Sequence, residues 1–190
     1  MRSSEDMYNY SAQHNLICGD EMHEWGWNPR AQFVVIKENL NDGEEVLATM
    51  LPKEIRDERS NFSFRGYCAL AVTARRIILG KARKKMNDVK VVSLEFVNDY
   101  KLSSFMFRNG MIEIDTPKEV MKIIFDTKAQ AQTAFELIKP MIEDFRQKDF
   151  SANTVQVSSA DEILKYKQLL DMGVITQEEF DIKKKQLLGI

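Results

Sequence analysis

The sequence predicts an α+β fold in which a bent antiparallel sheet, largely closed into a barrel, is capped by a helix and followed by a helical hairpin. Three observations carry this prediction. The middle of the chain holds about seven short runs in which apolar residues recur with a period of two, as expected for strands. One stretch with helical spacing follows these runs. Residues 160–190 then show two shorter helical patterns joined by a glycine-containing turn.

Residues 1–43 are predicted as an N-terminal segment with a short helix around Ser11–Leu16. A second helical stretch reads PRAQFVVIKENL. Pro29 suits the first turn of a helix, because the N–H that proline lacks has no partner there. Gly43 is expected to end this segment, since glycine readily adopts the left-handed conformation beyond a helix end.

Seven segments from residue 44 onward are predicted as strands, because β-branched and aromatic residues dominate them. They read EEVLATML, YCALAVT, RRIILGKA, VKVVSLEF, YKLSSFMFR, MIEIDT and VMKIIFDT. Asn109-Gly110 is the strongest two-residue hairpin signal, so a tight turn is expected between the fifth and sixth strands. The polar segment PKEIRDERSNFSF, after the first strand, is predicted as an exposed loop or a short helical excursion.

A helix is predicted directly after the strands, in TKAQAQTAFELIKPMIEDF. Thr127 and Gln130 have the spacing of a capping box, in which each side chain satisfies the other residue's backbone N–H. Pro140 removes a backbone donor, so a kink or a restart is expected there. The β-rich domain is predicted to span residues 44–147, with a polar linker at 148–159.

The stretch ALAVTARRIILGKARKK resembles bacterial pleckstrin-homology (PH)-like and GRAM-like domains, in which a hydrophobic strand ends in a Thr-x-x-Arg turn. Thr73 and Arg76 hold those two positions, and VVSLEFVNDYKLSSF resembles the next strand pair. The resemblance covers residues 44–146 and implies a PH-like fold and a bacterial or phage source. Eukaryotic PH domains bind phosphoinositides through basic strand loops, but many bacterial relatives have no known lipid, so the resemblance implies a fold better than a ligand.

The C-terminal pattern combines a glycine stop at Gly173 with a second capping box, Thr176 and Glu179. This stretch resembles the short C-terminal domain family, SHOCT. The matching positions are Leu164, Lys165 or Lys167, Leu169, Leu170, Asp171, Gly173, Ile175, Thr176, Glu178, Glu179, Phe180, Lys183, Lys184, Leu187 and Leu188. The resemblance implies a role in oligomerisation or in contact with a protein partner.

The hairpin at 160–190 is too small to fold alone. Below about 40 residues a chain usually needs a disulfide, a metal or a partner, and this segment has neither cysteine nor histidine. Its apolar stripe must pack on the β-rich domain, on a second copy or on another protein. The predicted partner-binding residues are Ile163, Tyr166, Leu170, Ile175, Phe180 and Leu187.

A basic hairpin at residues 81–90 offers an alternative partner, an anionic membrane surface. The residues predicted to contact lipid are Lys81, Arg83, Lys84 and Lys85. Each could contribute about 1 kcal/mol at such a surface. The same charges also protect a sheet edge from pairing with other chains, which is a purely structural use. The formal net charge of -2 argues against nucleic acid as a partner.

Catalytic and metal-binding patterns are sparse. His14, Cys18 and His23 form the one cluster of soft ligands, with His14 and Cys18 spaced for one helical face, but the spacing fits no zinc signature. No histidine follows residue 23, and G-x-S-x-G and glycine-rich phosphate-loop motifs are absent. We therefore expect a non-enzymatic protein without catalytic residues, cofactor or metal. Trp25 and Trp27 are expected to pin the N-terminal segment over the sheet or to anchor a partner.

The expected location is the cytoplasm. The N-terminus lacks the basic start and apolar core of a signal peptide, and no apolar run approaches the roughly 18 residues of a membrane span. Cys18 and Cys68 have no framework spacing, which favours free thiols in a reducing compartment, with Cys68 as a small core residue.

Overall fold

The structure is a computed structural model. It describes residues 1, 3–19, 28–60, 62–84, 86–105, 108–155, 163, 166–167, 170 and 176–188, with the side chains of 105, 149–155, 187 and 188 excepted. The chain divides into two compact units, Met1–Phe145 and Arg146–Ile190. Each unit is described here by itself.

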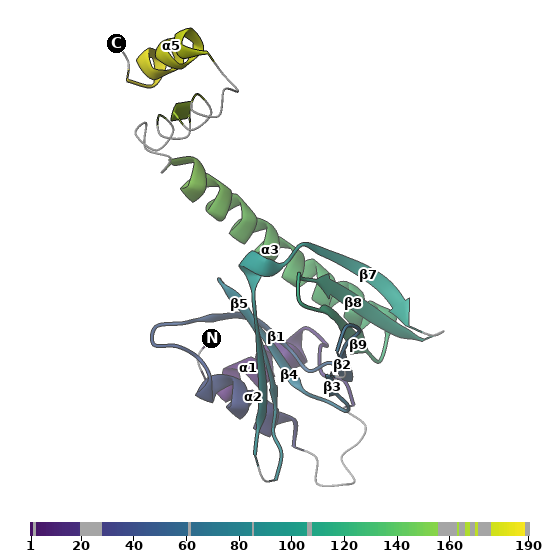
Figure 1. The fold of residues 1–190 in the computed structure, drawn as a ribbon. Helices are drawn as coiled ribbons and strands as arrows, with labels where there is room; N and C mark the ends of the chain where they lie inside the picture. The colour runs from purple at the N-terminus through teal and green to yellow at the C-terminus, as the bar shows by residue number, and fades with distance from the viewer. Residues whose placement is uncertain are drawn as a thin grey trace. The chain divides into compact units, whose positions relative to one another are not determined.

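The first unit is an α+β domain (Figure 1). Its strands are β1 (Val46–Met50), β2 (Glu54–Asp57), β3 (Ser63–Phe64), β4 (Ala69–Thr73), β5 (Arg76–Lys81), β6 (Asp88–Ser93), β7 (Asp99–Phe105), β8 (Asn109–Asp115) and β9 (Val120–Phe125). Its helices are α1 (Ser4–Gln13), α2 (Pro29–Glu38), the 3-10 helix η2 (Leu94–Phe96) and α3 (Lys128–Val155), which continues into the second unit. The strands form two antiparallel sheets, ordered β1-β4-β5-β6 and β3-β2-β9-β8-β7, with no closed barrel among the described residues.

All seven predicted strands are present, as β1 and β4 to β9, which confirms the α+β prediction. The strands β2 and β3 are additional, because the segment predicted as an exposed loop pairs with the second sheet. Ile55 lies opposite Ile123 of β9, and Phe64 of β3 lies opposite Ile55. Ile55 and Phe64 are buried, and their burial helps to hold this polar segment on the core.

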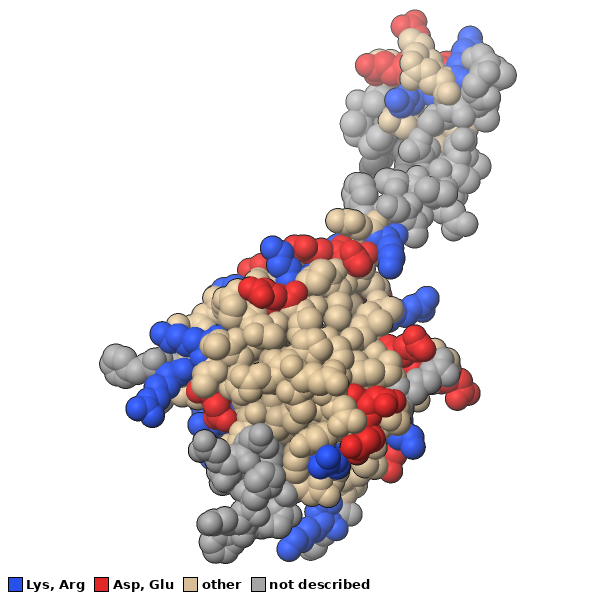
Figure 2. Space-filling view, turned by 180° about the vertical axis from the view of Figure 1, so that it is seen from behind, with Lys and Arg blue, Asp and Glu red and all other residues tan. Residues whose placement is uncertain are grey.

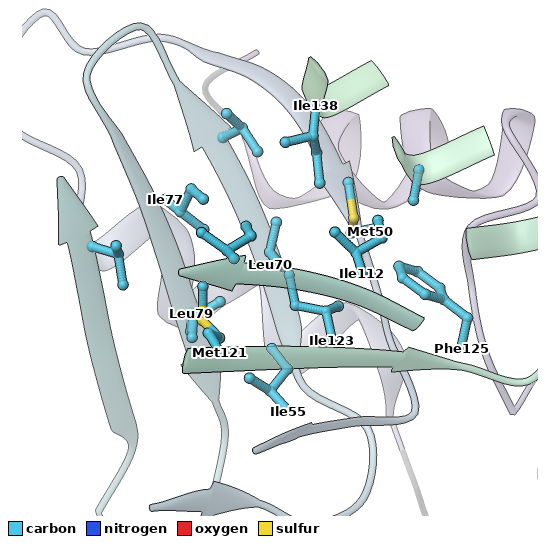
Figure 3. Close-up of a cluster of buried hydrophobic side chains, with 14 of the residues drawn as sticks. Met50, Ile55, Leu70, Ile77, Leu79, Ile112, Met121, Ile123, Phe125 and Ile138 are labelled. Atoms are coloured by element: carbon cyan, nitrogen blue, oxygen red, sulfur yellow. The ribbon is translucent and has the colours of Figure 1, made fainter. Parts of the chain in front are cut away.

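The main core lies between the two sheets and α3. Figure 3 shows side chains of both sheets pointing toward one another, with Ile138 of α3 among them. Met50, Leu70 and Ile77 come from the first sheet, and Phe125 from the second. Burial of each such side chain contributes about 1.5–3 kcal/mol to the free energy of folding.

A second core joins the outer face of the first sheet to α1 and α2. Met7 of α1 and Phe33 of α2 pack there with Ile78 of β5, and all three are fully buried. The helix α1 lies against β1, and α2 lies against β4 and β5. On β6, the fourth strand of the sheet, Val89 and Val91 stay partly exposed on this face.

The N-terminal helices agree with the sequence analysis in part. The helix predicted at PRAQFVVIKENL is confirmed as α2, and Gly43 beyond it has the expected left-handed conformation, with φ of 78°. The short helix predicted around Ser11–Leu16 is wrong in its bounds, because α1 covers Ser4–Gln13. The chain turns at Asn15, whose φ is 55°, and a short parallel bridge then pairs Ile17 with Leu51.

The first turn of α3 has the predicted capping box. The backbone N–H of Gln130 donates to Thr127 Oγ1 over 3.1 Å, and that of Thr127 donates to Gln130 Oε1 over 3.2 Å. The helix does not restart at Pro140 but continues through it to Val155. Its last residues therefore extend into the segment 148–159 that was predicted as a linker.

The predicted turn at Asn109-Gly110 is wrong, because both residues lie inside β8. Asn109 pairs with Phe105, and Gly110 pairs with Ser104 on one side and Phe125 on the other. The side-chain amide of Asn109 donates to the carbonyl of Phe125 over 2.9 Å. The residues that connect β7 to β8 include 106–107, which lie outside the described part of the chain.

None of the helices in the described part of the chain is both long enough and apolar enough to cross a bilayer.

Candidate functional site

The C-terminal hairpin is the first candidate site. Its second helix, α5 (Gln177–Leu188), starts at the predicted capping box, in which the backbone N–H of Thr176 donates to Glu179 Oε2 over 2.9 Å. The N–H of Glu179 donates in return to Thr176 Oγ1 over 3.3 Å. These hydrogen bonds from Thr176 lower the pKa of the Glu179 carboxyl. The sequence therefore specifies the start of α5 locally.

The first helical stretch of the hairpin lies beside α5. Ile163, Tyr166 and Leu170 are helical and half-buried. The ammonium of Lys183 on α5 lies 5.9 Å from the centre of the Tyr166 ring, within the range of a cation–π interaction. This contact places the two stretches next to each other within the second unit.

The predicted partner-binding residues fall into two groups. Phe180 is buried, while Ile163, Tyr166 and Leu170 are half-buried. None of these four side chains is fully exposed. Ile175 and the side chain of Leu187 lie outside the described residues. No partner is present, so partner contact by these residues stays a prediction.

Ile182 on α5 is the residue that the sequence analysis missed. Its side chain is 59% exposed, which is unusual for isoleucine on an amphipathic helix. Ile182 lies two residues after Phe180 and so points away from the predicted stripe. The sequence did carry a signal for Ile182, because this residue is apolar, lies off the predicted stripe and stands between Asp181 and Lys183.

The basic hairpin between β5 and β6 is the second candidate site. Lys81 donates to the carbonyls of Arg65 and Gly66, and burial lowers the pKa of its ammonium. Arg83 forms an ion pair with Asp88. Of these two predicted lipid contacts, Arg83 therefore closes the hairpin, and Lys81 ties the hairpin to the segment between β3 and β4. Lys84 is exposed, and Lys85 lies outside the described residues.

Met86 sits beside Lys84 near the tip of this basic hairpin and is 76% exposed. A thioether side chain is flexible and apolar, and such side chains are common at adaptable binding surfaces. The tip therefore combines an exposed cation with an exposed apolar group. The basic residues of this hairpin were predicted from the sequence, whereas Met86 was not.

A groove of about 620 Å³ lies at the end of the first sheet and is the third candidate site. Its lining comes from Asn41, Asp42, Gly43, Glu44, Glu45, Leu47, Thr73, Ala74, Arg75, Arg76, Val91 and Ser93. The segments that contribute are the α2–β1 loop, the β4–β5 turn and the end of β6. We call this cavity the sheet-end groove.

Arg76 fixes the walls of the sheet-end groove. Its guanidinium donates to both carboxylate oxygens of Glu44, over 2.8 and 2.5 Å, and to the carbonyl of Asn39 over 2.9 Å. The hydrogen bond from Arg76 is the main reason why the pKa of Glu44 falls to about 2. Thr73 Oγ1 accepts from the backbone N–H of Arg76 over 3.1 Å. The Thr-x-x-Arg pattern therefore builds a rigid turn that is tied to the α2–β1 loop.

Several exposed large apolar side chains lie on β6 or next to it in the chain. Val89 and Val91 are 38% and 45% exposed, and Phe96 follows in η2. Leu47, in the sheet-end groove, is exposed as well. Figure 2 shows, on one face of the first unit, an uncharged centre bordered by charged side chains.

The described members of the histidine and cysteine cluster, His14 and Cys18, are not arranged as metal ligands. His14 caps the end of α1, so it shares no helical face with Cys18, and its Nδ1 lies 2.8 Å from the carbonyl oxygen of Tyr10. Cys18 is buried and accepts from the backbone N–H of Asp126, and burial raises its pKa to about 12. Within the described residues, no group of three possible ligands is arranged to hold a metal ion. His23, Trp25 and Trp27 lie outside them.

The comparisons with known proteins identify one segment. The family model of the short C-terminal domain (SHOCT) matches residues 161–188. No curated protein matches the sequence. A solved structure titled autoinhibited Vav1 shows a likeness with a TM-score of 0.39 and 10% identity, covering 72% of this chain and 23% of that chain. The present chain therefore spans about a quarter of that protein, and the PH-like fold stays a prediction.

Proposed function

We propose that this chain is a non-enzymatic binding protein in which a PH-like domain carries a SHOCT hairpin that drives self-association. The observation that carries the proposal is the hairpin itself, a SHOCT match with an exposed Ile182 on α5. Covering the exposed side chain of Ile182 with another apolar surface is favourable, because it removes apolar area from water. A protein partner other than a second copy would serve the same purpose. The proposed compartment is the cytoplasm, and the free, buried thiols of Cys18 and Cys68 support it.

Removal of the hairpin tests this proposal. A chain that ends after Val155 keeps all strands, α1, α2 and the whole of α3. We expect it to stay folded, because both apolar cores lie within residues 1–145. Its mass by light scattering should be that of a monomer, whereas the full chain should form dimers or larger species at the same concentration. Equal association states for both chains would contradict the assembly role.

A peripheral membrane role is the second candidate, and the exposed Met86 favours it. The apolar side chain of Met86 could enter the headgroup region while the ammonium group of Lys84 faces anionic lipid. Each lysine near such a surface contributes about 1 kcal/mol. Arg83 and Lys81 are engaged within the protein, so this role depends on the tip alone.

Vesicle co-sedimentation tests the membrane role. We expect Lys84→Glu combined with Lys85→Glu and Met86→Asp to abolish binding to phosphatidylserine-containing vesicles at low salt. Lys37→Glu, on the exposed side of α2, is the matched control and should leave binding unchanged. The role is excluded if the unmodified protein does not sediment with the vesicles.

A further inference from the structure

The sheet-end groove and the exposed side of α5 have complementary properties. The groove exposes apolar surface at Leu47 and Val91, and α5 exposes Ile182. These residues come from separate compact units, and each is uncovered within its own unit. Two uncovered apolar surfaces in one chain suit an association in which the first surface of one copy meets the second surface of another.

The charges around these two surfaces also match. On α5, Glu178 lies one turn before Ile182, and Lys185 lies one turn after it, so that an acid and a base flank the isoleucine along one side of the helix. The lining of the sheet-end groove contains one exposed base, Arg75, and two exposed acids, Asp42 and Glu45. A helix seated with Glu178 toward Arg75 and with Lys185 toward the acids would pair opposite charges, which favours that direction of the helix.

The groove is also formed before any partner arrives. Arg76 ties the β4–β5 turn to Glu44 of the α2–β1 loop, and the ion pair is largely buried, with 18% and 13% of the two side chains exposed. The backbone of Arg75 is fixed through Leu94, whose N–H donates to its carbonyl over 2.8 Å. A preformed site loses little conformational entropy on binding.

We propose that the sheet-end groove is the docking site for helix α5 of a second copy of this chain, with Ile182 entering beside Val91. The inference rests on the proposed self-association and specifies its second surface. The contact is heterologous, because the hairpin of one copy occupies the groove of another. A closed dimer forms only if the hairpin of each copy occupies the groove of the other copy. If each hairpin docks on a different copy, the same contact builds larger species.

Light scattering of full-length variants tests the inference. We expect Val91→Asp in the groove and Ile182→Asp on α5 each to weaken self-association by about tenfold or more, because a charge replaces a buried apolar group. Val34→Asp is the matched control, since Val34 is a similarly exposed valine on α2 outside the groove. It should leave the association constant unchanged. Circular dichroism and thermal unfolding confirm that each variant is folded.

Mixing the two variants separates a heterologous contact from other arrangements. The Val91→Asp chain keeps an intact α5 and the Ile182→Asp chain keeps an intact groove, so an equimolar mixture should regain a heterodimer that neither variant forms alone. Arg75→Glu should likewise weaken association, and Glu178→Arg in the same chain should restore it.

Three results would overturn the inference. If the truncated chain is monomeric but Val91→Asp associates normally, the groove is not the docking site and the proposed function stands. If Val91→Asp weakens association and Ile182→Asp does not, the groove meets a surface other than α5. If the unmodified chain is a monomer at every concentration, both proposals fail. This result is expected if the chain's own hairpin or an unrelated protein occupies the sheet-end groove.

Discussion

Replacing Gly110 by alanine should lower the free energy of unfolding by about 2–3 kcal/mol, the upper range for overpacking a well-packed site. A Cβ at this position would lie 2.4 Å from the Cβ of Ala131, 2.9 Å from the Cα of Lys128 and 3.0 Å from the carbonyl oxygen of Thr127. Two of these atoms belong to the backbone of the first turn of α3 and its cap. The helix must therefore shift away from β8 to admit one methyl group.

Urea unfolding followed by circular dichroism measures this loss. Gly43→Asn is the matched control, because Gly43 has a left-handed φ and no atom within 4 Å of an added Cβ. Asparagine tolerates that conformation, so the control should change the free energy of unfolding by less than about 0.5 kcal/mol. A Gly110→Ala protein as stable as the parent would show that α3 is not seated on β8 as described.

Replacing Arg76 by methionine should cost about 2 kcal/mol at neutral pH. The change leaves the Glu44 carboxylate and the Asn39 carbonyl without their donor, in a site where both side chains of the ion pair are mostly buried. Loss of one partner of a fully buried pair costs about 3–5 kcal/mol, and partial exposure lowers this figure. Arg75→Met is the matched control, since that side chain is exposed, and it should cost less than about 0.5 kcal/mol.

The cost of Arg76→Met should also depend on pH. The pKa of Glu44 is about 2 in the folded protein, below its ordinary value of 4.5, so the ionised pair stabilises the fold above about pH 4.5. This stabilisation is lost as the pH falls from about 4.5 to about 2. Urea unfolding at pH 7 and pH 2.5 should therefore show a smaller difference between parent and variant at the lower pH. A difference that does not change with pH would mean that Glu44 is not the partner through which Arg76 stabilises the fold.

Local sequence signals were reliable where the interaction they describe is local. The two capping boxes at Thr127 and Thr176 were predicted correctly, because a side chain and a backbone group three residues apart need no other part of the chain. The seven long strand runs were recognised for a similar reason, since period-two alternation follows from the pleat of the strand itself.

The errors have a common cause, which is a partner distant in sequence. The Asn109-Gly110 pair has the composition of a turn, but the small size of Gly110 serves the close approach of α3. The polar segment that holds β2 and β3 becomes a pair of strands only because β9 lies beside it. Lys81 read as surface charge, yet its ammonium donates to the carbonyls of Arg65 and Gly66, which lie in the segment before β4.

For the candidate sites, the sequence located the hairpin at 160–190 and the basic loop but not the groove. A groove arises from segments that meet in space, here residues 41–45, the turn at Thr73–Arg76 and Val91 of β6. The sequence showed Thr73 and Arg76 as a turn signature. It did not show that Glu44 would be the partner of Arg76, since 32 residues separate the two in the chain.

The amino-acid sequence by itself determined the α+β class, the order of the principal elements and the identity of the C-terminal hairpin, because periodicity and capping act within a few residues. Tertiary structure alone decided how the strands divide into two sheets, why position 110 must be glycine and which apolar side chains stay exposed around β6 and at Ile182. These features depend on contacts between residues far apart in the chain. Whether a side chain fits or is buried is decided only when those residues are packed against one another.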